Sequence, residues 1–294
     1  MVIKTIVATA AAAMALAGCG ASADGAARSG AVDVVASTNV WGDIARQVTA
    51  GTKATVTSII TDPNADPHSY EASTRNELAV SQAGLIIENG GGYDDFMTTL
   101  RDGSGVKGIV LDAVKIAGTT GNEHVWYDFP AVAKVADRIA AVLAAKDAPD
   151  AKRLRSNAAA FTARLTALEA GEAQLRAKYA GAGVAITEPV PLYLLTACGL
   201  VNRTPAAFSD AVANGVDVPP RVLQQTLALF AEKQVRLLVY NAQTVGPQTQ
   251  QVQQAARANG IPVVPVTETL PAGQDYLSWM TGNLDAVGKA LGDG

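Results

Sequence analysis

The sequence predicts an α/β protein of two lobes, each with a mainly parallel sheet flanked by helices, joined by one long rigid linker helix. Three observations lead to this prediction. Short runs rich in β-branched residues alternate with longer helical patterns, which is typical of parallel sheets covered by helices. The alternation occurs in both halves of the 294 residues. Between the halves, an uninterrupted helical pattern occupies residues 150–179.

The first half contains four predicted strands and several helices. The strands are expected at residues 32–38, 55–60, 85–88 and 109–111, and the helices at 41–50, 74–82 and 130–145. Pro130 favours the first turn of the last helix, where its missing amide hydrogen is not needed. The run Asn89-Gly90-Gly91-Gly92 ends the third strand, because glycine favours turns.

The second half repeats this scheme after the long helix. Strands are expected at residues 184–187, 236–240 and 262–266, and helices at 193–198, 219–233, 247–259 and 275–291. In the long helix, apolar residues recur at steps of three, four and seven, which places them on one stripe: Leu154, Ala158, Phe161, Leu165, Leu168, Leu175 and Tyr179. At 1.5 Å per residue the helix would be roughly 45 Å long. Such a helix can cross from one lobe to the other, although packing within a single lobe is an alternative.

The start of the chain has the pattern of an export signal. One lysine precedes a small, apolar stretch at residues 5–17, and Leu16-Ala17-Gly18-Cys19 resembles a lipobox. The stretch is shorter than the roughly 20 apolar residues that span a membrane. We expect a signal peptide at residues 1–18, lipidation of Cys19 and an extracytoplasmic protein anchored to the membrane. The alternative is that Cys19 is an ordinary cysteine of the signal region.

The predicted domain organisation follows from these patterns. Residues 19–31 are rich in glycine, alanine and serine and are expected to form a flexible tether. The N-terminal lobe is expected at 32–149, the linker helix at 150–179 and the C-terminal lobe at 180–294. No later segment has the pattern of a transmembrane helix. With Cys19 lipidated, Cys198 has no partner for an intramolecular disulfide.

Composition limits the classes of function. The net charge of −4 and the pI of about 5.2 argue against a nucleic-acid partner. A hydrophobic content of 49% and a charged content of 17% fit a well-packed globule, which we expect to be a monomer. The phosphate-binding pattern G-x-x-x-x-G-K-[ST] does not occur, so no nucleotide site is expected.

His68 and His124 are the only histidines, and each lies in a run with acidic residues: Asp66-Pro67-His68-Ser69-Tyr70-Glu71 and Glu123-His124-Val125-Trp126-Tyr127-Asp128. A neutral imidazole can bind a divalent metal through one nitrogen while the other nitrogen donates to a carboxylate or carbonyl. These settings therefore predict one shared metal site. The alternative is two histidines that only satisfy local hydrogen bonds.

Two glutamates complete the predicted site. Glu188 follows the strand at 184–187, and Glu268 follows the strand at 262–266. In open α/β sheets, ligands bind beyond the carboxyl ends of the strands, so His68, His124, Glu188 and Glu268 are expected at one edge. Two imidazoles and two carboxylates suit a divalent first-row metal. Asp275 is an alternative to Glu268, although it is also placed to cap the last helix.

These motifs resemble those of the TroA-like family, the metal-specific substrate-binding proteins of ABC importers for zinc and manganese. The runs at Asp66–Glu71 and His124–Asp128 are similar to the family's first and second ligand motifs. Thr187-Glu188 resembles the third ligand position, and Val266-Thr267-Glu268-Thr269 the fourth, which is usually aspartate. The run Asp275-Tyr276-Leu277-Ser278-Trp279-Met280 with Asn283-Leu284 resembles the family's terminal helix. The resemblance covers about Val32 to Leu291.

The resemblance implies two α/β lobes joined by a long helix, capture of Zn²⁺ or Mn²⁺ outside the membrane, and delivery of the ion to an ABC permease. It implies no enzymatic activity. Two other classes remain as alternatives. A metallo-hydrolase would need a catalytic shell, yet H-E-x-x-H and G-x-S-x-G are both missing. A binding protein for a siderophore or corrinoid would need aromatic or arginine clusters, whereas aromatic content is 5%. The pattern does not separate zinc from manganese.

Overall fold

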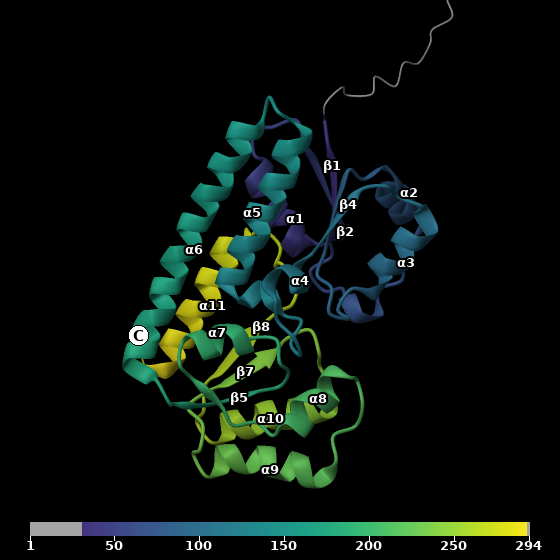
Figure 1. Ribbon diagram of the computed structural model, residues 1–294. Coiled ribbons are helices and arrows are strands. Elements are labelled where there is room, and N and C mark those ends of the chain that lie inside the picture. Colours follow the sequence, from purple (N-terminus) through teal and green to yellow (C-terminus); the bar gives the residue numbers. More distant parts are fainter. Residues whose placement is uncertain (1–30, 293–294) are drawn as a thin grey trace, which may run out of the picture.

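A computed structural model describes residues 31–292. It consists of two lobes, one above the other, with two long helices along one side (Figure 1). The expected signal peptide, Cys19 and nearly all of the expected tether lie outside the described residues.

The first lobe contains a parallel sheet in the order β2-β1-β3-β4. Its strands are β1 (Asp33–Thr38), β2 (Thr55–Ile60), β3 (Leu85–Glu88) and β4 (Ile109–Asp112). Side chains alternate between the two faces of a strand. In β1, Val34 and Ala36 accordingly belong to one hydrophobic core and Val35 to another. Both faces of the sheet are therefore buried.

Helices cover both faces of this sheet. The helices of the lobe are α1 (Asn39–Thr49), α2 (Thr74–Gln82), α3 (Asp95–Ser104), α4 (Ala113–Ala117) and α5 (Phe129–Lys146), with short 3₁₀ helices η1 (Pro67–Ser69) and η2 (Val125–Tyr127). Residues of α1 and α5 pack on the face of Val34, and residues of α2 and α3 on the face of Val35. Figure 1 shows α2 and α3 on the far side of the sheet from α5.

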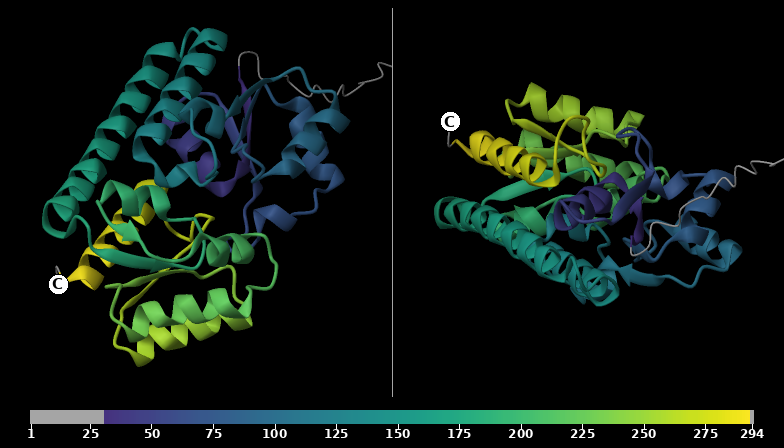
Figure 2. Two further views of the ribbon diagram at one scale, coloured as in Figure 1. Left: turned by 60° about the horizontal axis from the view of Figure 1, so that its bottom comes forward. Right: turned by 90° about the horizontal axis from the view of Figure 1, so that it is seen from above.

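The second lobe repeats this plan. Its strands β5 (Gly183–Ile186), β6 (Val201–Asn202), β7 (Leu238–Asn241) and β8 (Val263–Val266) form a parallel sheet in the order β6-β5-β7-β8. Its helices are α7 (Leu192–Ala197), α8 (Ala206–Ala213), α9 (Pro220–Ala231), α10 (Pro247–Ala258) and α11 (Tyr276–Leu291). Helices α8, α9 and α10 form the outer layer, and α7 and α11 lie on the face toward the first lobe (Figure 2).

Helix α6 (Ala151–Tyr179) packs against both lobes. The predicted stripe is buried along its length, and only Tyr179 is half-buried. The helix contacts α1 and α5 of the first lobe and α7 and α11 of the second. One continuous hydrophobic core contains Leu154 near its start and Leu175 near its end, together with strand residues from both sheets. The alternative in which this helix packs within one lobe is therefore excluded.

Side-chain hydrogen bonds also join the lobes directly. The amide of Asn39 both donates to the Leu270 carbonyl and accepts from the Leu270 amide, each at 2.9 Å. The Tyr127 hydroxyl donates to the Thr267 carbonyl at 2.9 Å. The Tyr276 amide donates to Asp43 Oδ2, also at 2.9 Å. These bonds join α1 and η2 of the first lobe to the loop after β8 and to the start of α11 in the second lobe.

The predicted fold class is confirmed, but helices α3, α4 and α8, strand β6 and the two 3₁₀ helices were not predicted. These elements are short, from two to ten residues. Such lengths offer too few repeats for a periodic pattern to be visible. Other elements differ by one or two residues at their ends; β5, for example, ends at Ile186 and leaves Thr187 in the following loop.

Two further observations concern residues 31–292 alone. No helix in this part of the chain combines the length and the apolar character needed to cross a membrane. Cys198 is buried and is not part of a disulfide within the same residues.

Candidate metal centre

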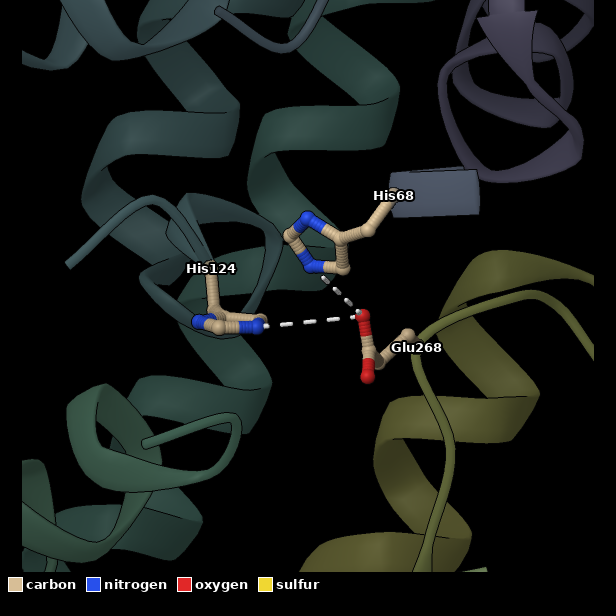
Figure 3. A group of neighbouring side chains, drawn as sticks. All are labelled: His68, His124 and Glu268. Carbon is tan, nitrogen blue, oxygen red and sulfur yellow. Dashed lines mark ion pairs between the residues drawn. The ribbon is translucent and has the colours of Figure 1, made fainter. Parts of the chain in front are cut away.

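Three of the four predicted residues converge between the lobes. His68 follows β2, His124 follows α4, and Glu268 follows β8. One ligand atom from each lies within 4.8 Å of the others. His68 Nε2 is 3.9 Å from Glu268 Oε2, and His124 Nε2 is 3.8 Å from the same oxygen (Figure 3). Two imidazoles from the first lobe therefore face one carboxylate from the second.

His124 is the deep member of the group, with a side chain only 3% exposed. Its Nδ1 lies 2.7 Å from Asn122 Oδ1, a carbonyl oxygen that can only accept a hydrogen bond. The proton therefore resides on Nδ1, and Nε2 presents a lone pair toward Glu268. Burial, and secondarily the nearby His68, lower the pKa of His124 to about 3. The ring is consequently neutral at physiological pH.

Hydrogen bonds hold the loop of His124 in place from both lobes. Asn89, at the end of β3, donates through Nδ2 to the Glu123 carbonyl at 2.9 Å. The Asn122 amide donates to the Pro189 carbonyl at 3.2 Å, and the Tyr193 hydroxyl donates to the Asn122 carbonyl at 2.8 Å. The Asn122 side chain that orients the imidazole is thereby attached to the second lobe.

His68 lies at the mouth of the site, with 37% of its side chain exposed. It belongs to η1, whose start is defined by Asp66 and Pro67. Asp66 accepts hydrogen bonds from the His68 amide and from the Ser69 hydroxyl, both at 2.9 Å, and so acts as a cap. The His68 ring packs edge-on against Tyr93, with ring centroids 4.9 Å apart. The acidic run around His68 thus orients its backbone.

Glu268 is buried, and its two oxygens have different surroundings. Oε1 accepts from Asn241 Nδ2 at 2.7 Å. Oε2 has no hydrogen-bond partner among residues 31–292 and faces both imidazoles. Burial, together with the charge of Glu188, raises the pKa of Glu268 to about 8. A nearby cation would counter both effects.

Glu188 lies beside this group and is not one of the three residues within 4.8 Å. It is buried near the start of the loop that follows β5, and its Oε2 accepts a short hydrogen bond from Asn241 Nδ2. Burial raises its pKa to about 7. Glu188 therefore lies at the predicted edge of the sheet, but its carboxylate is hydrogen-bonded to Asn241.

Asp275, the alternative to Glu268, caps helix α11. Its carboxylate accepts from the Ser278 amide at 2.7 Å, and the Asp275 backbone amide donates to the Ser278 hydroxyl at 3.1 Å, which together form a capping box. The Ser278 amide also lowers the pKa of Asp275. The structure therefore places Asp275 at a helix terminus and outside the group of converging ligand atoms.

Three residues that shape the site were not predicted: Asn122, Tyr93 and Asn241. Asn122 could have been noticed, because it lies two residues before His124. Tyr93 follows the glycine run after β3, and its ring packs against His68 and Trp126. Its backbone position depends on Gly90 at φ +76°, where an added Cβ would clash with Asp112. Asn241 ends β7 and carries no local signal.

The three converging groups could hold a cation. Because His124 is neutral, its contact with Glu268 is not an ion pair; an imidazole nitrogen with a free lone pair and a carboxyl oxygen lie 3.8 Å apart. A metal ion bound tetrahedrally at 2.0–2.1 Å would bring such atoms to roughly 3.4 Å of one another. A small inward movement of the side chains is enough to reach that spacing.

Comparison with known proteins agrees with this geometry. The family described as zinc-uptake complex component A, periplasmic, matches residues 34–290. The chain belongs to this family. Its members are substrate-binding proteins, so the chain is not an enzyme, and the predicted family is confirmed.

Two kinds of relative illustrate the family. The manganese-binding lipoprotein MntA of Halalkalibacterium halodurans is 29% identical over 160 residues, which cover 52% of this chain and 53% of that protein. The chain thus spans about half the length of this curated relative. Two solved structures match almost completely, with coverage of 88–89% of this chain and 97–99% of theirs.

The first of these structures is FpvC from P. aeruginosa in complex with Ni²⁺, with a TM-score of 0.73 and 22% identity. The second is the periplasmic zinc-binding protein TroA from Treponema pallidum, with a TM-score of 0.72 and 16% identity. At these identities the likeness shows a shared fold. The two-lobe architecture of the family is therefore present in this chain.

Proposed function

We propose that this protein captures a divalent transition metal ion, Zn²⁺ or Mn²⁺, outside the cytoplasm and delivers it to an ABC permease. The observation that carries the proposal is the convergence of two imidazole Nε2 atoms on one buried carboxylate oxygen. His68, His124 and Glu268 would bind the ion, and Glu188 would complete the set. Membership of a metal-uptake family and a manganese-binding relative support the same role.

The size of the space beside Glu268 argues against an organic ligand. The cavity there has a volume of about 230 Å³ and is lined in part by Asp66, Gln243 and Thr244. Pockets for organic ligands usually measure about 300–1,000 Å³ and are mainly apolar. The cavity is therefore too small for a siderophore or a corrinoid, whereas its volume is sufficient for a single metal ion.

Metal content tests the proposal directly. Protein purified without chelator should contain zinc or manganese at about one ion per chain, measured by mass spectrometry of the elements. After treatment with chelator, adding Zn²⁺ or Mn²⁺ should raise the unfolding temperature, because a ligand at 100 times its Kd stabilises the folded state by about 2.7 kcal/mol. Mg²⁺ is the control. Protein that retains neither metal and shows no shift with either ion would overturn the proposal.

Equal concentrations of the two ions then decide which is preferred. Imidazole nitrogens favour zinc, which also lies higher in the Irving–Williams order, whereas two carboxylates favour manganese. The metal recovered after competition gives the preference of the site.

Attachment to the membrane is a separate part of the proposal. We expect Cys19→Ala to release the protein from the membrane fraction without changing its metal affinity, because the thiol would carry lipid and would not bind metal. Cys198→Ala is the matched control, since Cys198 is buried in the second lobe. Fractionation followed by immunoblotting measures the effect. A Cys19→Ala protein that stays with membranes after a high-salt wash would contradict lipidation.

A further inference from the structure

Asn241 is placed between the two buried carboxylates. It is the last residue of β7 and is 1% exposed. Its Nδ2 donates to Glu268 Oε1 at 2.7 Å and makes a short hydrogen bond to Glu188 Oε2. One amide group therefore contacts both acidic residues of the candidate site.

The orientation of this amide is determined by its neighbours. Asn241 Oδ1 accepts from the Gln243 backbone amide at 3.1 Å, and an amide nitrogen can only donate. The NH₂ group must then point the other way, toward the carboxylates. The Asn241 backbone amide donates to the Thr187 hydroxyl at 2.9 Å, which attaches this residue to the loop that carries Glu188.

The two carboxylates need such a donor. They are both buried, and the charge of Glu188 raises the pKa of Glu268. Two like charges in one buried place repel each other, and a hydrogen bond to the charged form reduces that cost. One oxygen of each carboxylate accepts a hydrogen bond from Asn241, and the other oxygen of Glu268, Oε2, faces the imidazoles.

We infer that Asn241 is a positioning residue that makes Glu188 and Glu268 act as one unit, and that this unit sets how well the site accepts manganese relative to zinc. The inference rests on the proposed function and goes further by naming the residue that controls metal preference. Zn²⁺ can be bound mainly through the two imidazole nitrogens, and Asn241 does not contact either imidazole. Manganese depends more on oxygen ligands, so misplaced carboxylates weaken manganese binding more.

The test compares the affinities of full-length protein and variants for Mn²⁺ and Zn²⁺. Asn241→Leu keeps the approximate size of the side chain and removes the donor. We expect the Kd of this variant for Mn²⁺ to rise roughly 10- to 100-fold, which is the usual cost of losing a group that orients a metal ligand. The factor by which its Kd for Zn²⁺ rises should be about ten times smaller. Asn241→Gln, which keeps an amide donor, should recover part of the loss.

A second measurement asks whether Asn241 acts through Glu188. In a Glu188→Gln background, Asn241→Leu should cost less manganese affinity than it does alone, because residues that work as a unit are not additive. Asn157→Leu is the matched control: this asparagine of α6 bonds to the backbone carbonyls of Val48 and Ala50 in the first lobe, and not to either carboxylate. It should leave both Kd values unchanged.

Equal losses for both metals in Asn241→Leu would show a merely structural role and overturn the inference. Full additivity with Glu188→Gln, or Kd values within about threefold of wild type for both metals, would overturn it as well. These outcomes are distinct from failure of the proposed function, in which the wild-type protein itself binds neither Mn²⁺ nor Zn²⁺.

Discussion

Replacing either histidine with alanine is expected to abolish high-affinity metal binding. His124→Ala removes the buried Nε2 that faces Glu268 Oε2, and His68→Ala removes the second imidazole at the mouth. Loss of a group that merely orients a ligand costs about 10- to 100-fold in affinity, so loss of the ligand itself should cost at least that much. Titration with Zn²⁺ and Mn²⁺ measures the effect.

The fold should survive both changes. The His68 ring is partly exposed, and Tyr93 is the one aromatic ring among residues 31–292 on which it packs, so its removal should cost little stability. His124 contacts Tyr93 and Trp126, and its removal leaves a small cavity. Circular dichroism and thermal unfolding without metal serve as controls, with Ser69→Ala as a matched variant beside His68. A variant that binds either metal within about threefold of wild type would show that its histidine is not a ligand.

Glu268→Gln is expected to weaken metal binding by about an order of magnitude or more. The substitution replaces a carboxylate with a neutral amide in a site whose imidazoles are also neutral, and ligand carboxylates bind in their ionised form. Glu268→Asp should be tolerated better, because it keeps the charge and shortens the reach by one methylene. Calorimetry with each metal compares the two.

Asp275→Asn is the control for this prediction. Asp275 caps α11 and lies outside the group of ligand atoms, so its replacement should lower stability slightly and leave metal affinity unchanged. A large loss of affinity in Asp275→Asn with none in Glu268→Gln would mean that the fourth ligand has been assigned to the wrong residue.

The raised pKa of Glu268 predicts a dependence on pH. The folded protein holds this proton up to about pH 8, whereas the unfolded chain releases it near 4.5. Between these values the folded state binds more protons, so without metal the contribution of Glu268 makes stability fall as pH rises. Metal binding displaces the proton and should therefore strengthen as pH rises toward 8. In Glu268→Gln this part of the pH dependence should be lost.

Most strands and helices of this protein, and two of its candidate metal ligands, are visible in the sequence because their signals are local. The apolar stripe from Leu154 to Leu175 is a property of one segment, and it predicts a buried helix without reference to any other part of the chain. His68 and His124 are recognisable because each carries its acidic neighbours within a few residues. The strand ends likewise indicated Glu268 and Glu188 as candidates.

Only the tertiary structure decided how these groups are used. Glu268 meets the histidines, while Glu188 turns to Asn241, a residue 53 positions away in the chain. Asn122 orients His124 through a hydrogen bond between residues two positions apart in the sequence. The position of Asn122 itself, however, depends on hydrogen bonds to Pro189 and Tyr193 of the other lobe. Such bonds leave no periodic pattern, because they join side chains whose separation in sequence is unrelated to their separation in space. The types of the candidate ligands therefore follow from the sequence, and their geometry, tautomer and hydrogen-bond partners follow from the packing of the two lobes.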